Sequence, residues 1–432
     1  MHPDTESSDW AICIWNCWIH INSGYQEETV MSMNETPSSE RVQIGFFGRR
    51  NAGKSSVINR LTGQSLSVVS DVPGTTTDPV RKAMEIHGLG PCVVIDTAGL
   101  DDVGELGALR VQKTKDMMDR IDLAVIVIGD GKISPDEKEL QTRFAKKNIP
   151  VILCFNKQDL GLPVSLPEDA VQVSAETGYG FDELTHAIRV RAKEKIRTAG
   201  MLDDLITKND TVILVIPMDA EAPKGRIILP QQMVLHEILL HHASACVCQT
   251  EELADVLNQN PDCRLVITDS QAFYRVKDIV PDNVPLTSFS ILMARYRGYL
   301  KAAVEGVQEI EKLTDGDTVL VAEGCTHRRT CGDIGSVKIP ALLKKYTGRK
   351  LNIELSSGST MKEDLSSCRL VIHCGGCVLN DREMASRRDH AIRQGTPITN
   401  YGIAVSYMRG ILGRSLRMLP EFAELAAELP TV

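Results

Sequence analysis

The chain lacks a surplus of positive charge. Its 48 lysines and arginines are outnumbered by 57 aspartates and glutamates, for a formal net charge of −9 over 432 residues. Broad binding to nucleic acid needs a basic surface, so this balance argues against a nucleic-acid partner. The sequence also contains no apolar run of transmembrane length, no low-complexity stretch and no long-period repeat. We therefore expect a globular cytoplasmic protein of two or three domains, with no nucleic-acid partner and no membrane partner.

Tryptophan is absent after residue 18, which sets the N-terminus apart from the rest of the chain. The apolar run Trp10–Ile21 has the length of a signal-peptide core, but no lysine or arginine precedes Arg41 and no small-residue cleavage site follows. We expect residues 1–33 to be a non-native or disordered extension, with Met31 or Met33 as the working start. The alternative is an amphipathic tethering segment.

The twelve cysteines are scattered and do not form the compact framework of a small secreted protein. In a long chain without an export signal, clustered cysteines more often indicate a metal site. Strand and helix patterns alternate from Arg41 onward, which predicts parallel α/β architecture in three blocks, residues 34–204, 205–289 and 290–432. The expected strands include Val42–Phe47, Cys92–Asp96, Leu123–Ile128, Val151–Phe155, Thr211–Ile216, Ser244–Cys248, Leu265–Thr268, Thr318–Glu323 and Leu370–Ile372, and a single helix is expected over Arg295–Leu313.

A phosphate-loop pattern lies between the first strand and the first helix. It consists of Gly48, four further residues, Gly53, Lys54 and Ser55, with Asn51 inside the loop. Its backbone N–H groups can cradle phosphates at a helix N-terminus, while Lys54 reaches the β- and γ-phosphates and Ser55 binds Mg²⁺. Ser56 follows in the first helical turn, and we expect the two arginines of the loop, Arg49 and Arg50, to face solvent at its edge.

Four further elements follow in the order found in guanine-nucleotide-binding domains. A polar loop at Pro73–Asp78 offers a Mg²⁺-binding hydroxyl, for which Thr76 is the first candidate and Thr75 and Thr77 are close rivals. Asp96 ends a buried strand beside the expected Mg²⁺, and the N–H of Gly99 lies near the γ-phosphate.

The remaining two elements specify the base. Asn156, Lys157 and Asp159 follow a buried strand, and the Asp159 carboxylate can accept from N1–H and the exocyclic amine of guanine, an arrangement that adenine does not offer. Lys157 lies along the base and Asn156 ties this loop to the phosphate loop, while a backbone N–H of the segment Ser174–Ala175 faces guanine O6. All five elements sit at strand C-termini, where open α/β sheets bind ligands, so the sequence predicts GTP binding.

These motifs resemble the translation-factor class of GTPases, and within it the subfamily of tRNA-modification and ribosome-assembly GTPases. Leu100 stands where Ras-like GTPases carry a water-orienting glutamine, which implies slow intrinsic hydrolysis. Asn51 occupies the position of the K⁺-coordinating asparagine in potassium-activated members, so the resemblance implies a K⁺ ion acting in place of an arginine finger.

A cysteine–histidine constellation marks the last block. Cys325 and His327 follow one expected strand, and His373, Cys374 and Cys377 follow another. Three thiolates favour a soft or borderline metal, and residue types leave two forms open: a tetrahedral Zn²⁺ site with a histidine, or a [4Fe–4S] cluster on three cysteines with one exchangeable iron site. We expect the neighbouring Cys331 and Cys368 to pack as small hydrophobic residues.

This metal motif behind a guanine-specific domain resembles the family of GTPase scaffold proteins of [FeFe]-hydrogenase maturation over about residues 34–432. The resemblance implies a P-loop NTPase domain (34–204), an α/β dimerisation domain (205–289) and an α/β iron–sulfur-binding domain (290–432). It implies a homodimer with a [4Fe–4S] cluster on Cys325, Cys374 and Cys377, and with His327 or His373 as fourth-ligand candidates. Family members receive a two-iron subcluster precursor from radical-SAM maturases and deliver it to the apo-hydrogenase.

The hypothesis is therefore a GTP-hydrolysing assembly scaffold whose nucleotide state changes loops around Pro73–Asp78 and Gly99–Gly107. The alternative is a K⁺-dependent RNA-modification or ribosome-associated GTPase with a structural zinc site, which predicts a basic appendage that the sequence lacks. A redox switch in which the cluster gates the GTPase is a third option. In the middle block, an apolar stripe at Val234, Leu235, Ile238 and Leu239 predicts core packing or a dimer interface.

Overall fold

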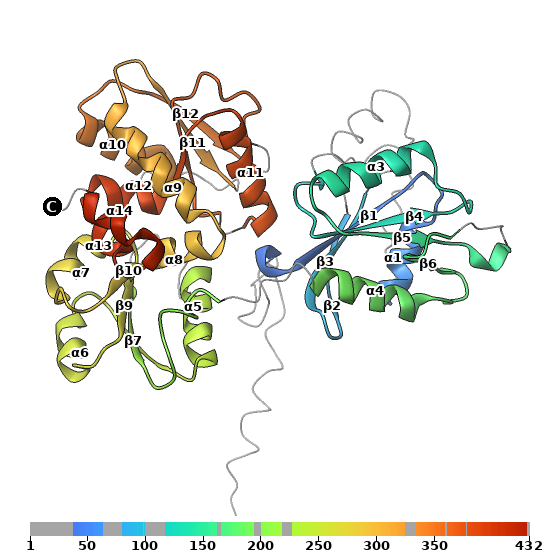
Figure 1. Cartoon of the computed structure of the whole chain (residues 1–432), viewed down its shortest axis with the longest axis horizontal. Helices are drawn as coiled ribbons and strands as arrows, with labels where there is room; N and C mark the ends of the chain where they lie inside the picture. The colour runs from blue at the N-terminus through green and yellow to red at the C-terminus, as the bar shows by residue number, and fades with distance from the viewer. Residues whose placement is uncertain are drawn as a thin grey trace, which may run out of the picture. The chain divides into compact units, whose positions relative to one another are not determined.

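The computed structural model describes residues 38–63, 80–97, 99, 117–161, 166–193, 200–217, 227–324, 333–358, 361–376 and 378–429. The N-terminal extension, the loop with Thr76, the segment with Leu100, and Cys325, His327, Cys331 and Cys377 lie outside these residues. Within them, the structure has three sheets, each covered by helices, as the α/β prediction requires (Figure 1).

The first sheet has the strand order β2-β3-β1-β4-β5-β6, with β2 antiparallel to β3 and the other pairings parallel. Its helices lie on both faces: α1 and α4 pack on one side and α3 on the other (Figure 1). The elements are β1 (Val42–Phe47), α1 (Lys54–Thr62), β2 (Val80–Ile86), β3 (Gly90–Asp96), β4 (Leu123–Ile128), α3 (Pro135–Lys146), β5 (Val151–Phe155), β6 (Ala170–Gln172) and α4 (Phe181–Lys193), with 3-10 helices η1 (Ser38–Glu40) and η2 (Gln158–Leu160).

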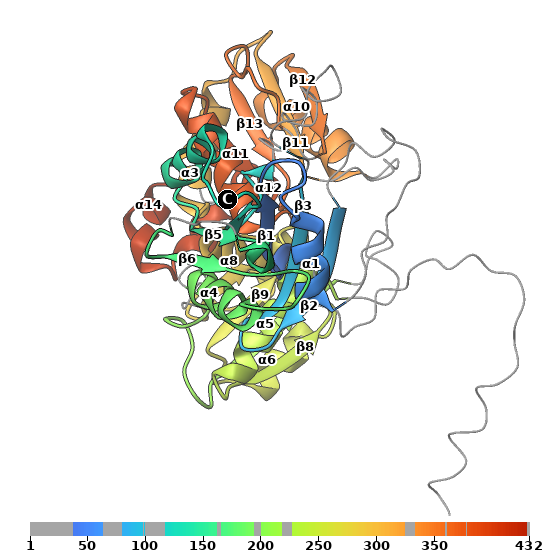
Figure 2. The ribbon, with the colours of Figure 1, turned by 90° about the vertical axis from the view of Figure 1, so that its right-hand side faces the viewer.

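The second sheet is parallel with the order β10-β9-β7-β8, so β8 is an edge strand and borders this part of the fold in Figure 2. Helices α5 and α8 bury one face, and α6 and α7 bury the other. The elements are β7 (Thr211–Val215), α5 (Leu229–Leu240), β8 (Ser244–Cys248), α6 (Leu253–Gln259), β9 (Leu265–Thr268), α7 (Phe273–Ile279), β10 (Leu286–Ser288) and α8 (Phe289–Tyr296).

The third sheet is also parallel, with the order β12-β11-β13-β14. Its elements are α9 (Leu300–Val307), β11 (Thr318–Glu323), α10 (Ile339–Thr347), β12 (Asn352–Ser357), β13 (Leu370–His373), α11 (Asp381–Arg393), β14 (Ile398–Asn400), α12 (Tyr401–Met408), α13 (Leu412–Leu416) and α14 (Ala423–Glu428), with short helices η3 (Gln308–Lys312), η4 (Ile334–Lys338) and η5 (Pro420–Phe422). One hydrophobic cluster contains residues of both the second and the third sheet, including Val212 of β7 and Val321 of β11.

The structure corrects two expectations. The single helix expected over Arg295–Leu313 is instead α8, α9 and η3, because Gly298 adopts a left-handed backbone (φ 65°) between the first two. The first sheet is not wholly parallel, because the polar strand β2 pairs antiparallel with β3 at its edge. Of the helices in the described ranges, none is long and apolar enough to cross a membrane.

Candidate functional site

The phosphate loop connects β1 to α1 and owes its path to three residues with positive φ: Gly48 (144°), Asn51 (61°) and Gly53 (91°). At Gly53 a Cβ atom would lie 2.3 Å from Nδ2 of Asn156, and at Gly48 it would lie 2.3 Å from the carbonyl oxygen of Val127. Glycine is therefore required at both positions, where the loop packs closely against neighbouring strand ends. The side chain of Asn51 is exposed.

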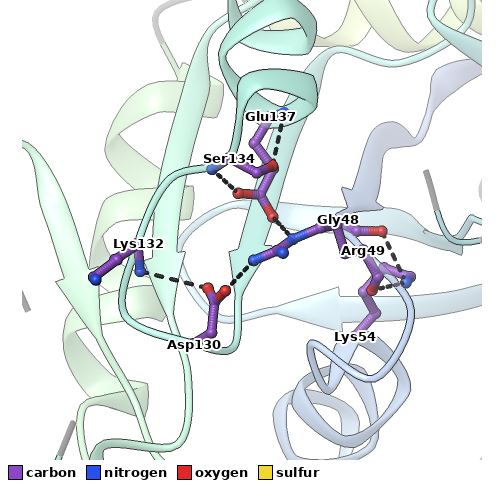
Figure 3. Close-up of polar contacts among 7 residues, drawn as sticks. All are labelled: Gly48, Arg49, Lys54, Asp130, Lys132, Ser134 and Glu137. Atoms are coloured by element: carbon purple, nitrogen blue, oxygen red, sulfur yellow. Dashed lines mark hydrogen bonds and ion pairs between the residues drawn. The ribbon is translucent and has the colours of Figure 1, made fainter. Parts of the chain in front are cut away.

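Lys54, the first residue of α1, is almost fully buried and folds back over this loop. Its Nζ donates hydrogen bonds to the carbonyl oxygens of Gly48 (3.0 Å) and Arg49 (2.9 Å) (Figure 3). These bonds hold the ammonium against the loop, the position from which a P-loop lysine donates to β- and γ-phosphates.

Ser55 and Asp96 lie together beside the loop, with Ser55 Oγ donating to Asp96 Oδ2 (2.5 Å). The other oxygen, Oδ1, is buried and has no hydrogen-bond partner among the described residues. Burial raises the pKa of Asp96, while the bond from Ser55 and the charge of Lys54 oppose that rise. A buried, unsatisfied carboxylate oxygen next to a hydroxyl fits a hard divalent cation such as Mg²⁺. Ser56 is exposed and Gly99 is half-buried.

The guanine-specific loop is joined directly to the phosphate loop. Nδ2 of the buried Asn156 donates to the carbonyl oxygen of Ala52 (3.1 Å), so the tie expected between the two loops is present. Oδ1 of Asn156 accepts from the N–H of Ala175 (3.1 Å), and Ser174 Oγ donates to Asp159 Oδ1 (2.5 Å). Two strand-end loops far apart in sequence are thereby held in one arrangement around the expected base.

Two further features complete this loop. Lys157 has a left-handed backbone (φ 66°) and precedes η2, the short helix that contains Asp159. Both residues reach the surface: Lys157 is half-buried and Asp159 is exposed. An exposed carboxylate next to a half-buried lysine is compatible with a base entering from solvent.

The expectation that both arginines of the phosphate loop face solvent is wrong for Arg49 and correct for Arg50, which is exposed. The guanidinium of Arg49 lies between two carboxylates: Nη2 donates to Asp130 Oδ2, and Nε pairs with Glu137 Oε1 at 3.5 Å (Figure 3). Asp130 follows β4 and Glu137 lies in the first turn of α3. Motif spacing alone could not have revealed these two partners.

The described part of the metal constellation lies at the C-terminal end of β13. His373 is fully buried, with Nδ1 bonded to the carbonyl oxygen of Cys374 (2.7 Å) and Nε2 bonded to Nη1 of Arg387 (2.9 Å). Burial, with the charge of Arg387 adding to it, lowers the pKa of His373 to about 4. The ring is therefore neutral, and because an arginine can only donate, the Nδ1 atom carries the proton.

Cys374 itself is half-buried, and its Sγ accepts the backbone N–H of Gly324 (3.1 Å). Gly324 follows β11, the strand paired with β13, and immediately precedes Cys325 in the sequence. No cluster of metal-ligating side chains occurs within the described ranges, which exclude Cys325, His327 and Cys377. Cys368 packs into the hydrophobic core, as expected.

Two buried arginines around this loop were not anticipated from sequence. Nη1 of Arg297 donates to the carbonyl oxygens of Gly375 (3.3 Å) and Gly376 (2.8 Å), and Nη2 of Arg387 donates to that of Gly358 (2.7 Å). Arg297 lies far from the cysteines in sequence and Arg387 lies on the following helix, α11, so both are outside the motif itself. Arg297 fixes the backbone of the loop that follows Cys374, and Arg387 joins His373 to the backbone of Gly358.

Three family models match the chain in succession. The 50S ribosome-binding GTPase model matches residues 43–157, the hydrogen maturase F dimerization domain residues 201–298, and the hydrogen maturase F tetramerization domain residues 301–418. The two maturase models together span half of the chain. The first domain is therefore a GTPase domain, the part of the molecule that binds and hydrolyses GTP with Mg²⁺, and the following two domains are those of a self-associating protein.

The curated relatives match only part of the chain. The tRNA modification GTPase MnmE of Hamiltonella defensa is 36% identical over 160 residues, or 34% of each chain, and GTPase Der of Wolinella succinogenes is 31% identical over 42% of this chain and 38% of that protein. The chain thus spans about a third to two fifths of the length of the relatives it matches. The G domain of the T. maritima FeoB iron transporter is 23% identical, with a TM-score of 0.26, over 35% of this chain and 99% of that domain.

Proposed function

Because the chain belongs to the hydrogen maturase F family, we propose that it is a GTP-hydrolysing scaffold that assembles the two-iron subcluster precursor of the [FeFe]-hydrogenase active site. It receives the precursor from radical-SAM maturases and delivers it to the apo-hydrogenase in the cytoplasm. The observation that carries the proposal is the Cys374 loop, which closes on Gly324, the residue before Cys325. The tRNA modification GTPase of Hamiltonella defensa matches only 34% of this chain and 34% of its own length, so it provides little support for an RNA substrate here.

We assign the resident [4Fe–4S] cluster to Cys325, Cys374 and Cys377. The N–H donated by Gly324 to Cys374 Sγ is the kind of bond that stabilises a thiolate, and the two cysteines follow neighbouring parallel strands. Three thiolates leave the fourth iron site open to an exchangeable ligand, and this is the chemistry that the cluster supplies when bound. The domain limits at residues 34–204, 205–289 and 290–432 are part of the same proposal.

The two histidines of the motif take different roles in this proposal. Both ring nitrogens of His373 bond to protein groups, so this residue holds the loop in place. His327 is then the candidate for the exchangeable fourth position. Should His373 serve instead, its bond with Arg387 must first break, at the expense of a buried charge-assisted contact.

The charge around the loop supports an anionic group. Arg297 and Arg387 are buried and fixed to backbone carbonyl oxygens of the loop and its neighbour. A cluster held by three thiolates carries net negative charge, and the buried guanidinium of Arg387 offsets it. Arg297 also pairs with Asp381 (3.4 Å) and Glu40 (3.9 Å), so part of its charge is already compensated.

At the nucleotide site, we propose that Thr76 supplies the second Mg²⁺-binding hydroxyl besides Ser55, with Asp96 alongside, and that Gly99 contacts the γ-phosphate. Asn51 coordinates K⁺, which acts in place of an arginine finger. The exposed side chain of Asn51 supports this role, because a loop-stabilising asparagine would be turned into the protein. Gly48, Gly53, Lys54 and Ser56 belong to the phosphate cradle, and Asn156, Lys157, Asp159, Ser174 and Ala175 to the base site.

We propose that self-association takes the form of a homodimer through the edge of the second sheet. Val234 and Ile238 of α5 are buried in the core, but Leu239 and Leu240 are 62% and 65% exposed, and Val247 on the edge strand β8 is 51% exposed. An open edge strand next to exposed leucines is the kind of surface that a second copy can cover.

GTP hydrolysis can influence the cluster loop through a direct contact. Asn380, which caps α11 just after the Cys374–Cys377 segment, donates through Nδ2 to the carbonyl oxygen of Arg120 (2.5 Å), and Arg120 pairs with Glu383 (3.0 Å). Arg120 lies thirteen residues after Gly107, the end of the segment Gly99–Gly107 that is expected to respond to nucleotide. We propose that this contact couples nucleotide state to precursor transfer.

Anaerobic reconstitution with iron and sulfide tests the proposal most directly. Metal analysis should find about four irons per chain, and EPR of the reduced protein should show a cluster signal that changes when imidazole or cyanide is added, because one iron site is exchangeable. A protein that binds one zinc and forms no reducible cluster would refute the scaffold function and favour the zinc-containing alternative.

A further inference from the structure

Arg49 connects the phosphate loop to two parts of the GTPase domain that carry no nucleotide motif. Its side chain is 31% exposed and reaches Asp130, in the loop after β4, and Glu137, in the first turn of α3. Asp130 also accepts the N–H of Lys132 through Oδ1 (3.4 Å), so its carboxylate is held from both sides (Figure 3). The bond with Arg49 lowers the pKa of Asp130, which keeps this carboxylate charged at neutral pH.

Glu137 is the more constrained of the two acids. Its side chain has no exposed surface, and it forms a capping box with Ser134: Oε2 accepts the Ser134 N–H (2.8 Å), and Ser134 Oγ accepts the Glu137 N–H (3.3 Å). Oε1 makes no hydrogen bond among the described residues and faces Arg49 Nε at 3.5 Å. A buried carboxylate needs a compensating charge, and Arg49 provides one.

The backbone of Arg49 takes part in the phosphate loop itself. Its carbonyl oxygen accepts from both Lys54 Nζ (2.9 Å) and the N–H of Ala52 (3.3 Å). At Gly129, just before Asp130, a Cβ atom would lie 2.7 Å from Cα of Ala52, so the end of β4 is in close contact with the loop. One residue therefore holds the catalytic lysine through its carbonyl group and the neighbouring loop through its guanidinium.

We propose that Arg49 is a positioning residue for nucleotide binding, which fixes the phosphate loop against the β4–α3 connection and neutralises two carboxylates beside the site that accepts polyphosphate. Without it, the loop gains freedom that binding must remove, and Asp130 and Glu137 repel the incoming phosphates. The inference requires only that this domain binds GTP, so it is independent of the role in hydrogenase maturation.

The test compares Arg49→Ala with Arg143→Ala in the full-length chain. Arg143 lies on α3 and pairs with Glu139 on the exposed surface, so its loss removes an arginine from the same helix region without touching the loop. Arg49→Ala should raise the Kd for both GTP and GDP and the KM for GTP by about tenfold or more, the scale of a lost charge-assisted bond. The kcat at saturating GTP should change less than about twofold, since equal loss of ground-state and transition-state binding leaves kcat unaltered. Arg143→Ala should match the wild type.

Two further variants separate positioning from general stability. Glu137→Gln retains the capping box but removes the buried charge, so Arg49→Ala combined with Glu137→Gln should bind GTP more tightly than Arg49→Ala alone. Arg49→Lys keeps the charge but cannot bridge two carboxylates as a guanidinium does, and its affinity should fall between those of the wild type and Arg49→Ala. If Arg49→Ala does not fold, Arg49→Lys against the wild type decides the matter, because an unchanged Kd for GTP in Arg49→Lys would then overturn the inference.

Three results would overturn the inference. Arg49→Ala with a lowered Tm but an unchanged Kd would make Arg49 purely structural. A loss of kcat with an unchanged Kd would place it in the chemical step. Strictly additive effects in the double variant would show that Arg49 and Glu137 act independently. In each case, GTP binding by the wild type and by Arg143→Ala would leave the GTPase assignment intact.

Discussion

The nucleotide site and the metal constellation both lie at the C-terminal ends of parallel strands, but their described side chains differ in the groups that they bond. Around the phosphate loop, Asn156, Lys54 and Arg49 already form the hydrogen bonds and ion pairs that define the site. At the end of β13, the described residues contribute one cysteine thiol, Cys374, and a histidine whose two nitrogens bond to protein. Within the described residues, the phosphate loop is thus held by side chains from other strand ends, and the loop after β13 is held by buried groups around His373.

Burial shifts the pKa in opposite directions at Asp96 and at His373. At Asp96 it raises the pKa of a carboxyl group that has one unsatisfied oxygen, a cost that a bound cation removes. At His373 it lowers the pKa to about 4, and the neutral ring is satisfied by Cys374 and Arg387. The first group therefore favours a bound cation, while the second favours the loop conformation in which both of its ring nitrogens are bonded.

The largest expected effect separates the two sites completely. Cys374→Ser should abolish incorporation of the iron–sulfur cluster, because a hydroxyl is a poor ligand for this soft centre, and should leave GTP hydrolysis within about twofold of the wild type. Iron analysis measures cluster incorporation, and a phosphate-release assay on the same preparation measures GTP hydrolysis. Cys368→Ser, at a buried core cysteine, is the matched control and should retain iron. Loss of both iron binding and GTP hydrolysis in Cys374→Ser would mean that the two sites form one structural unit.

Asp159→Asn tests the assignment of Asp159 to guanine recognition at the nucleotide site. The carboxylate is expected to accept hydrogen bonds from two guanine donors. The variant should therefore bind GTP about tenfold or more weakly and bind xanthosine triphosphate more tightly than the wild type does. Competition of each nucleotide against a fluorescent GDP analogue gives the Kd for GTP and the Kd for xanthosine triphosphate. Asp182→Asn, on the exposed first turn of α4, serves as the control. An unchanged GTP affinity would contradict the assignment of Asp159 to the base.

Replacing K⁺ by Na⁺ at constant ionic strength tests Asn51. If K⁺ takes the place of an arginine finger, hydrolysis should slow by at least about tenfold while GTP affinity changes little. Asn51→Ala should give the slow rate in both salts. Equal rates of the wild type in KCl and NaCl would remove the proposed role of Asn51.

The smallest effect concerns thiol reactivity. Burial raises the pKa of Cys92 to about 11 and of Cys154 to about 12, so at pH 8 these thiols stay protonated and unreactive. In the apoprotein, brief iodoacetamide treatment at pH 8 should therefore modify Cys374 before either of them, with denatured protein as the control for full labelling. Raising the pH toward 11 should increase labelling of Cys92 only if it also becomes exposed. Equal labelling of Cys92, Cys154 and Cys374 at pH 8 would contradict this expectation, because it would mean that the two buried thiols are as accessible as Cys374.

Local pattern accounted well for the strands of the first domain. The bounds predicted for Val42–Phe47, Leu123–Ile128 and Val151–Phe155 are those observed. The last two are continuous apolar runs, as strands buried on both faces of a parallel sheet are. The same reasoning missed β2, a polar edge strand, and merged α8 with α9, since the apolar spacing continues across Gly298. Those features depend on strand pairing and on one left-handed residue.

For the sites, the sequence by itself determined which residue types stand at the strand ends: the phosphate loop, Asp96, the guanine-specific loop, and the cysteines and histidines after β11 and β13. Contiguous motifs carry this information because each is a short segment with its own chemistry. The tertiary structure alone decided which side chains hold these segments, including Arg49 between Asp130 and Glu137, and Arg387 on His373. The physical reason is that a buried charge is compensated by whichever opposite or accepting group the fold places next to it, however far away that group lies in the chain.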